Sequence, residues 1–184
     1  LPGARLVIVP RHPKRLAEIL KNLSEIGIDP QLLSDLRTGE VPDVTRPAIV
    51  DTIGELERVF GLANIAYVGG SLIPHGGQNM LEPAAQGHPV LTGPYLENFT
   101  QEARILTRAE AVRIVADTAE LTAALAELGA DGALRKRMGS AGMEATRSQQ
   151  GAAALTLRAL QASCHRWMLC SHVESPAIQM LAQA

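Results

Sequence analysis

The sequence predicts an α/β fold, a Rossmann-like parallel sheet with helices on both faces, from three observations. Short apolar runs alternate with segments in which apolar residues recur at helical spacing, as in β–α–β units. Hydrophobic residues make up 46% of the 184 residues but aromatic ones only 3%, so the core must consist of Leu, Val, Ile and Ala, which suits parallel strands covered by helices. Polar or glycine-rich segments follow three of the expected strands, at the edge where such sheets bind ligands.

The first half of the chain divides into strands and helices by its apolar pattern. The expected strands are short apolar runs at residues 6–9, 31–36, 48–51 and 63–68. Pro10 stops the first of them, because proline cannot donate to a sheet. Apolar residues at helical spacing predict a helix over 14–26, which Gly27 ends. Residues 37–46 contain Gly and Pro and predict a loop, and 54–62 predict a second helix.

The second half is richer in helix. Two strands are expected, at 89–92 and 111–115, and Asp117 is the expected N-cap of the helix that follows the second. The expected helices are rich in Ala and Leu and comprise 79–87, 98–108, 118–128, 131–146 and 151–163. We therefore expect one Rossmann-like domain over 1–163 and a C-terminal tail over 164–184, to which the pattern assigns no structure.

Composition excludes several classes of protein. A net charge of −2 gives no electrostatic basis for nucleic-acid binding. Cys164 and Cys170 form neither a disulfide framework nor a zinc site, and the histidines lack metal-ligand spacing, so neither a metal nor a cofactor is expected. No apolar run reaches the roughly 18 residues of a membrane-spanning helix. The chain begins within a few residues of a strand and without Met, so we expect a fragment or a single domain of a longer protein.

The segment 68–98 is the most informative, with six glycines and four prolines between two apolar runs. Gly70 and Ser71 follow a buried strand, and a short helix is expected to begin at Asn79. Free N–H groups at such a helix start can hold a phosphate, and Glu82 is placed to accept hydrogen bonds from a pair of sugar hydroxyls. The alternative, a surface turn with a solvated Glu, leaves the two glycine pairs unexplained.

Two further motifs follow strands. Arg11 and His12 offer a guanidinium fork and a ring donor for phosphate or carboxylate, although a polar loop with Pro at the first helical position explains them equally well. Gly54 allows a ligand to approach the backbone. At that motif a capping box of Thr52 and Glu55 accounts for both polar residues without any ligand.

These motifs together resemble one family. The strings PRHPKR, DTIGEL and VGGSLIPHGGQNMLEPAAQGHPVLTGPYLENF are similar to the C-terminal half of bacterial 3-deoxy-D-manno-octulosonic acid (Kdo) transferases of lipopolysaccharide synthesis, over residues 1 to about 160. The resemblance implies the C-terminal domain of a GT-B glycosyltransferase, an inverting enzyme without a metal, that binds the donor CMP-Kdo. It also implies a lipid A precursor (lipid IVA) as acceptor and the cytoplasmic face of the inner membrane as the location.

The resemblance assigns substrate-binding roles, each to residues of a different motif. Arg11 and His12 would lie near the donor phosphate or sugar acid, and Gly54 and Glu55 would border the cytidine. The remaining residues so assigned come from the long glycine-rich motif. Gly70 and Ser71 would approach the nucleotide, and Asn79 and Glu82 would contact phosphate and ribose.

No catalytic residue is expected in this chain, because the family's catalytic base and membrane-anchoring segment belong to an N-terminal domain that these residues do not contain. We expect the chain by itself to bind donor without transferring it. Two alternatives stay open: a GT-B transferase or epimerase that uses a UDP-sugar, and a truncated, non-catalytic nucleotide-sugar-binding module.

Overall fold

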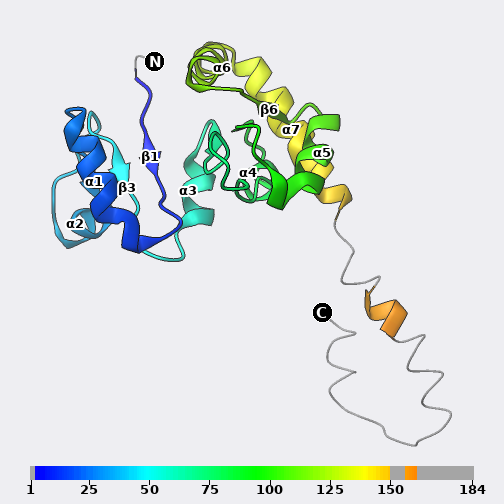
Figure 1. Cartoon of the computed structure of the whole chain (residues 1–184), viewed down its shortest axis with the longest axis horizontal. Helices are drawn as coiled ribbons and strands as arrows, with labels where there is room; N and C mark the ends of the chain where they lie inside the picture. The colour runs from blue at the N-terminus through cyan, green and yellow to red at the C-terminus, as the bar shows by residue number, and fades with distance from the viewer. Residues whose placement is uncertain (1–2, 150–155, 161–184) are drawn as a thin grey trace, which may run out of the picture. The chain divides into compact units, whose positions relative to one another are not determined.

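The strands of the protein are all parallel, as the sequence predicts, but their hydrogen bonds group them into two three-stranded sheets. The computed structural model describes residues 3–149 and 156–160. The first sheet has the order β1-β3-β2 and the second the order β4-β5-β6. Figure 1 labels β1 and β3 of the first sheet and β6 of the second. The strands are β1 (Val7–Ile8), β2 (Gln31–Leu32), β3 (Ala48–Ile49), β4 (Ala66–Val68), β5 (Val90–Thr92) and β6 (Val112–Ile114).

Helices follow nearly every strand. Two 3-10 turns, η1 (Pro13–Arg15) and η2 (Glu97–Phe99), lead directly into helices. The α-helices are α1 (Leu16–Glu25), α2 (Leu33–Thr38), α3 (Leu56–Leu62), α4 (Leu81–Ala85), α5 (Thr100–Arg108), α6 (Thr118–Ala130) and α7 (Gly132–Ser148). Asp117 caps α6 as predicted, since its carboxylate accepts hydrogen bonds from the amides of Ala119 and Glu120.

Two of the predicted elements differ from the structure. The expected strand 31–36 ends at Leu32, and α2 begins at Leu33. The cause lies in the tertiary structure, because Asp51 at the end of β3 accepts hydrogen bonds from the amide and the hydroxyl of Ser34 in the first turn of α2. The helix expected over 79–87 is also shorter and spans only Leu81–Ala85.

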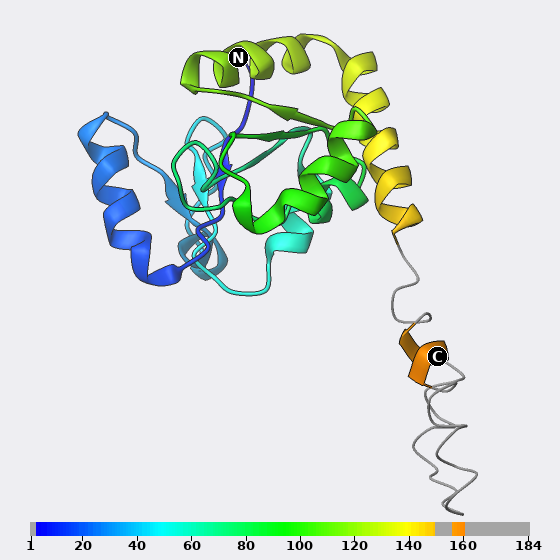
Figure 2. The same cartoon turned by 45° about the vertical axis from the view of Figure 1, so that its right-hand side comes forward.

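The second sheet lies between two layers of helices. Val90 and Val112 face a cluster with residues of α4, α5 and α7, whereas Leu91 faces the opposite side, toward α6. This alternation follows from the period of two in a strand. Figure 2 shows the strands of this sheet with α5, α6 and α7, coloured green to yellow, around them.

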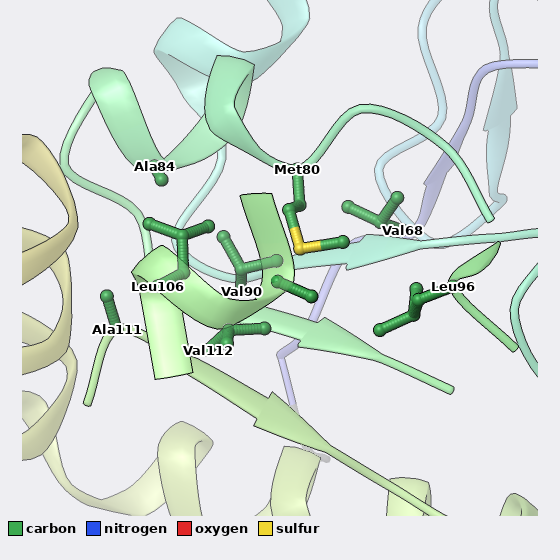
Figure 3. Packing of buried hydrophobic residues seen from close by; sticks show 9 residues of the cluster. Val68, Met80, Ala84, Val90, Leu96, Leu106, Ala111 and Val112 are labelled. Atoms are coloured by element: carbon green, nitrogen blue, oxygen red, sulfur yellow. The ribbon is translucent and has the colours of Figure 1, made fainter. Parts of the chain in front are cut away.

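The cluster on the α4 and α5 side of this sheet contains a methionine as well as the expected aliphatic residues. Met80 is fully buried and packs with Val68 of β4 and Val90 of β5 (Figure 3). An unbranched thioether adapts to the irregular space between a strand and a short helix. Residue 80 therefore joins the glycine-rich loop to the core, which fixes the loop's far end.

Residues 1–147 form one unit and residues 148–184 a second. Of the helix expected over 151–163, the structure describes residues 156–160, which are helical, and the tail 164–184 lies outside the described residues. In the described part of the chain, none of the helices has the length and apolar character needed to cross a membrane.

Candidate functional site

The loop after β4 is built around Ser71, whose side chain is fully buried. Its hydroxyl donates to the carbonyl of Val68, at 2.6 Å, and accepts from the amide of Gly93 after β5, at 2.8 Å. Its carbonyl accepts from the amide of Tyr95, at 3.0 Å. The hydroxyl of Ser71 is therefore enclosed and already has two partners. The approach of Ser71 to a nucleotide stays a prediction.

The second glycine pair of this loop is occupied by protein. A Cβ on Gly76 would lie 2.1 Å from the Asn98 amide nitrogen, and one on Gly77 would lie 2.9 Å from a methyl of Leu96. Both glycines are buried and have positive φ angles of 79° and 73°. The close approach that the sequence indicated at this pair is thus made by the segment after β5.

The first glycine pair is open. A Cβ on Gly69 would meet nothing within 4 Å, and one on Gly70 would make only ordinary contacts, the nearest at 3.6 Å with Gln78. The amides of Gly69 and Gly70 donate to no acceptor among the described residues. Two successive free amides at the end of a strand, beside open space, suit an anion.

Asn79 and Glu82 are bonded to each other. The side-chain Nδ2 of Asn79 donates to Glu82 Oε1, at 2.9 Å, and the side-chain Oδ1 of Asn79 accepts from the backbone amide of Leu81, at 3.0 Å. Asn79 thus uses one of the amides that the sequence analysis assigned to phosphate. Glu82 is exposed and keeps its second carboxylate oxygen free of the described residues.

Arg11 and His12 lie beyond the carboxyl end of β1, and both are exposed. The side chains of both make no hydrogen bond or ion pair with the residues that the structure describes. Because β1 pairs with β3, these two residues share an edge of the first sheet with the segment that follows β3. A free guanidinium at this edge is available for an anionic ligand.

The predicted capping box after β3 is wrong. Helix α3 begins at Leu56 with Glu55 at its N-cap and no side-chain capping bond, and the buried hydroxyl of Thr52 has no partner within the described part of the chain. Glu55 instead accepts a hydrogen bond from Arg37 of α2, at 2.7 Å, and pairs with Arg58, at 3.5 Å. The Arg37 guanidinium holds the pKa of Glu55 below its usual range.

Gly54 retains the openness that the sequence indicated. It has a φ of 87°, and a Cβ there would meet nothing within 4 Å. The side chain of Glu55 is only 14% exposed, so less of it than expected is available to a ligand. The role of either residue toward a nucleoside stays a prediction.

The structure brings the predicted residues into two groups. Hydrogen bonds connect the Gly70–Ser71 turn to the segment after β5, and Asn79 to Glu82. Arg11 and His12 lie at the edge of the first sheet with Gly54 and Glu55. The sequence analysis missed the part played by Gly93 and Asn98, because their signal is a contact between two loops distant from each other in the chain.

Other surface features do not coincide with these loops. A hollow of about 460 Å³ is lined by Thr107, Glu110, Arg137 and neighbouring apolar residues, at the amino end of β6. Within the described residues, no group of three or more His, Cys, Asp or Glu side chains is arranged to hold a metal ion.

Comparison with known proteins gives several relatives that are 3-deoxy-D-manno-octulosonic acid transferases. The chain is 37% identical over 158 residues to a 3-deoxy-D-manno-octulosonic acid transferase of Haemophilus influenzae, covering 82% of this chain and 35% of the relative. It is 33% identical over 160 residues to the enzyme of the same name from Bordetella pertussis, covering 87% of this chain and 37% of the relative. The chain therefore spans about a third of the length of these curated relatives. No protein-family model matches it.

One solved structure has the same fold. The C-terminal CMP-Kdo binding domain of WaaA from Acinetobacter baumannii matches with a TM-score of 0.69 and 26% identity, over 76% of this chain and 72% of that domain. This match confirms the predicted Rossmann-like class, that of the C-terminal domain of a GT-B protein.

Proposed function

Because the chain is a homologue of the 3-deoxy-D-manno-octulosonic acid transferases and corresponds to their C-terminal domain, we propose that it binds CMP-Kdo as a sugar donor. The strongest support is the match to the CMP-Kdo binding domain of WaaA, combined with the two free amides of Gly69 and Gly70 beside open space. These amides follow β4, at the carboxyl edge where ligands of α/β sheets bind.

In this proposal the phosphate of the donor lies at the Gly69–Gly70 turn, and the guanidinium of Arg11 assists. Cleavage of the glycosidic bond moves negative charge onto the leaving phosphate. Fixed amide dipoles and a cation then stabilise the transition state more than the ground state, and this is the condition for catalysis. His12, beside Arg11, is assigned to the carboxylate of the sugar acid.

The nucleoside lies between the remaining residues in the same proposal. Gly54, with no side chain and open space above it, borders the cytosine, and Glu55 flanks it. Glu82 accepts hydrogen bonds from the ribose hydroxyls through its free oxygen, while Asn79 orients the carboxylate.

The longer protein to which this domain belongs would transfer Kdo from CMP-Kdo to a lipid A precursor, lipid IVA, with inversion and without a metal. The catalytic base would come from a separate N-terminal domain, at the cytoplasmic face of the inner membrane. This chain by itself would bind the donor without transferring the sugar.

Titration of the chain with CMP, followed by calorimetry or by NMR, tests the proposal. Arg11→Ala should weaken CMP binding by about tenfold or more, since hydrogen bonds to charged groups contribute about 1.5–3 kcal/mol. Glu82→Gln should weaken it in the same direction. Arg108→Ala and Glu102→Gln, which change equivalent side chains on α5, serve as matched controls.

Three outcomes would contradict the proposal. Absence of CMP binding would refute it, and UMP binding more tightly than CMP would favour a UDP-sugar enzyme. Equal affinities for the parent, Arg11→Ala and Glu82→Gln would place the nucleotide elsewhere on the domain.

A further inference from the structure

Two loops at the carboxyl edge of the second sheet are joined by four hydrogen bonds. The β4–α4 loop comprises residues 69–80 and the β5–α5 loop residues 93–99. Two of the bonds involve Ser71, with Gly93 and Tyr95, as described above. Asn98 makes the other two. Its backbone amide donates to the backbone carbonyl of Gly76, at 3.3 Å, and its side-chain Nδ2 donates to the backbone carbonyl of His75, at 3.5 Å.

The bond between Ser71 and Gly93 differs from the other three because it is fully buried. Ser71 and Gly93 are both buried, and a Cβ on Gly93 would lie 2.1 Å from the carbonyl oxygen of Ser71. Water therefore cannot replace the Ser71 hydroxyl without the loops separating. A buried donor or acceptor left without its partner is costly, so the arrangement is strongly preferred.

The hydroxyl of Ser71 also fixes the start of its own loop. It donates to the carbonyl of Val68, the last residue of β4, while Gly70 takes a φ of 69°. The carbonyl of Gly70 accepts from the amide of Gly77, at 2.9 Å, which closes the loop on itself. In the sequence, Gly69 and Gly70 thus lie between Ser71, which carries the hydroxyl, and Val68, whose carbonyl accepts from it.

We propose that Ser71 is a positioning residue of the donor site: its buried hydroxyl joins the two loops and so holds the amides of Gly69 and Gly70 in the orientation that binds the donor phosphate. This inference rests on the proposed function and adds to it, since the hydroxyl of Ser71 is buried and bonded to protein on both sides.

Ser71→Ala in the full chain tests the proposal by two measurements. Without ligand, hydrogen exchange at the Gly93 amide should become about tenfold faster or more, because the amide loses its acceptor. In the binding titration, the affinity for CMP should fall by about tenfold, because losing the free energy of about one hydrogen bond raises a dissociation constant by about that factor. Thr92→Val is the matched control, because it removes a buried neighbouring hydroxyl for which the described residues supply no hydrogen-bond partner.

A second control separates positioning from loss of stability. Asp117→Ala removes the cap of α6, which lies outside both loops, and should lower the melting temperature without changing CMP affinity by more than about twofold. A purely structural role of Ser71 would make the two variants behave alike in binding. If Ser71→Ala does not fold, Ser71→Cys keeps a weak donor in the buried space and should bind CMP several-fold more weakly than the parent.

The outcomes distinguish this inference from the function on which it rests. If the parent chain fails to bind CMP, the proposed function is refuted and the role of Ser71 with it. If the parent binds CMP and Ser71→Ala, or Ser71→Cys in its place, binds equally well, the donor site stands and the positioning role is refuted. Unchanged exchange at Gly93 in Ser71→Ala would refute the positioning role by itself.

Discussion

Asp51 accepts two hydrogen bonds from Ser34: the Ser34 amide donates to one carboxylate oxygen, at 3.0 Å, and the Ser34 hydroxyl donates to the other, at 2.5 Å. The carboxylate stands at the end of β3, and Ser34 is in the first turn of α2. Asp51 therefore satisfies the amino end of a helix that is distant in sequence, in the way that an N-cap residue does for its own helix. This contact explains why helix replaces the expected strand after Leu32.

Asp51→Ala should destabilise the chain by about 2 kcal/mol at pH 7, because two charge-assisted hydrogen bonds are lost and the first turn of α2 is left without a partner. Denaturant unfolding measures this directly. Asp35→Ala changes an exposed carboxylate of the same helix and should cost no more than about 0.5 kcal/mol. Equal decreases in the free energy of unfolding for the two variants would show that the hydrogen bonds to Ser34 do not stabilise the fold.

The same bond should make the stability depend on pH. Burial by itself would raise the pKa of Asp51, but the hydroxyl and amide of Ser34 lower it below its usual value. A lowered pKa in the folded state means that the stabilisation is complete above about pH 4 and is lost as the pH falls further. The difference in stability between the parent and Asp51→Ala should therefore shrink below about pH 4. A difference that stayed constant down to pH 2.5 would contradict this.

His88 should produce a second pH dependence at higher pH. Burial lowers the pKa of its imidazole, an effect that the backbone of Phe60 offsets only in part, and Nε2 is buried with no hydrogen-bond partner among the described residues. The unfolded chain thus takes up the proton first, so stability should decline as the pH falls below about 6.5, by at most about 1.4 kcal/mol per pH unit.

The variant His88→Asn tests this decline, because its side chain is polar but does not titrate. Unfolding measured from pH 7.5 to 5.5 should show a smaller slope than in the parent. His75→Asn, which changes an exposed imidazole, distinguishes the loss of a buried ring from the loss of any ring. Identical slopes for the parent and His88→Asn would refute the prediction.

The packing of α7 depends on a glycine. A Cβ on Gly139 would lie 1.9 Å from the backbone oxygen of Gly87, in the turn between α4 and β5. Because backbone atoms cannot move aside cheaply, Gly139→Ala should destabilise the chain by about 2 kcal/mol or more.

Gly132→Ala in the same helix provides the comparison for Gly139. A Cβ on Gly132 would come no closer than 3.5 Å to any neighbour, a side-chain nitrogen of Arg135. This change should therefore be neutral or stabilise the chain by up to about 1 kcal/mol, from helix propensity. Similar melting temperatures for the two variants would argue against the close contact at Gly139.

Gly69→Ala should separate folding from binding. Its added methyl group meets no protein atom within 4 Å and Gly69 is not among the glycines of positive φ, so the melting temperature should change little. If the donor phosphate approaches this residue, CMP affinity should nevertheless fall by about tenfold, the effect of roughly 1.4 kcal/mol. Unchanged affinity would exclude a ligand from the space above Gly69.

Sequence reasoning reached the fold class, the parallel strands and most helices because these follow from local periodicity. It indicated open backbone at Gly54 and Gly70, which the structure shows, because glycine at a strand end has few explanations; that a ligand binds there stays a prediction. It failed at Glu55, which matched a local capping pattern but is held by Arg37 from another helix. It gave no sign of the hydrogen bond between Ser71 and Gly93, because that bond joins two separate loops.

By itself, the sequence determined a Rossmann-like chain of Leu, Val, Ile and Ala with glycine-rich turns at its strand ends, because periodicity and backbone freedom are properties of neighbouring residues. Only the tertiary structure decided which glycines face open space and which face protein: Gly69 is open, whereas Gly76 is filled by Asn98. It also decided that Asp51 binds Ser34 and that the hydroxyl of Ser71 lies inside the fold. These outcomes depend on contacts between segments distant in sequence, which no local pattern encodes.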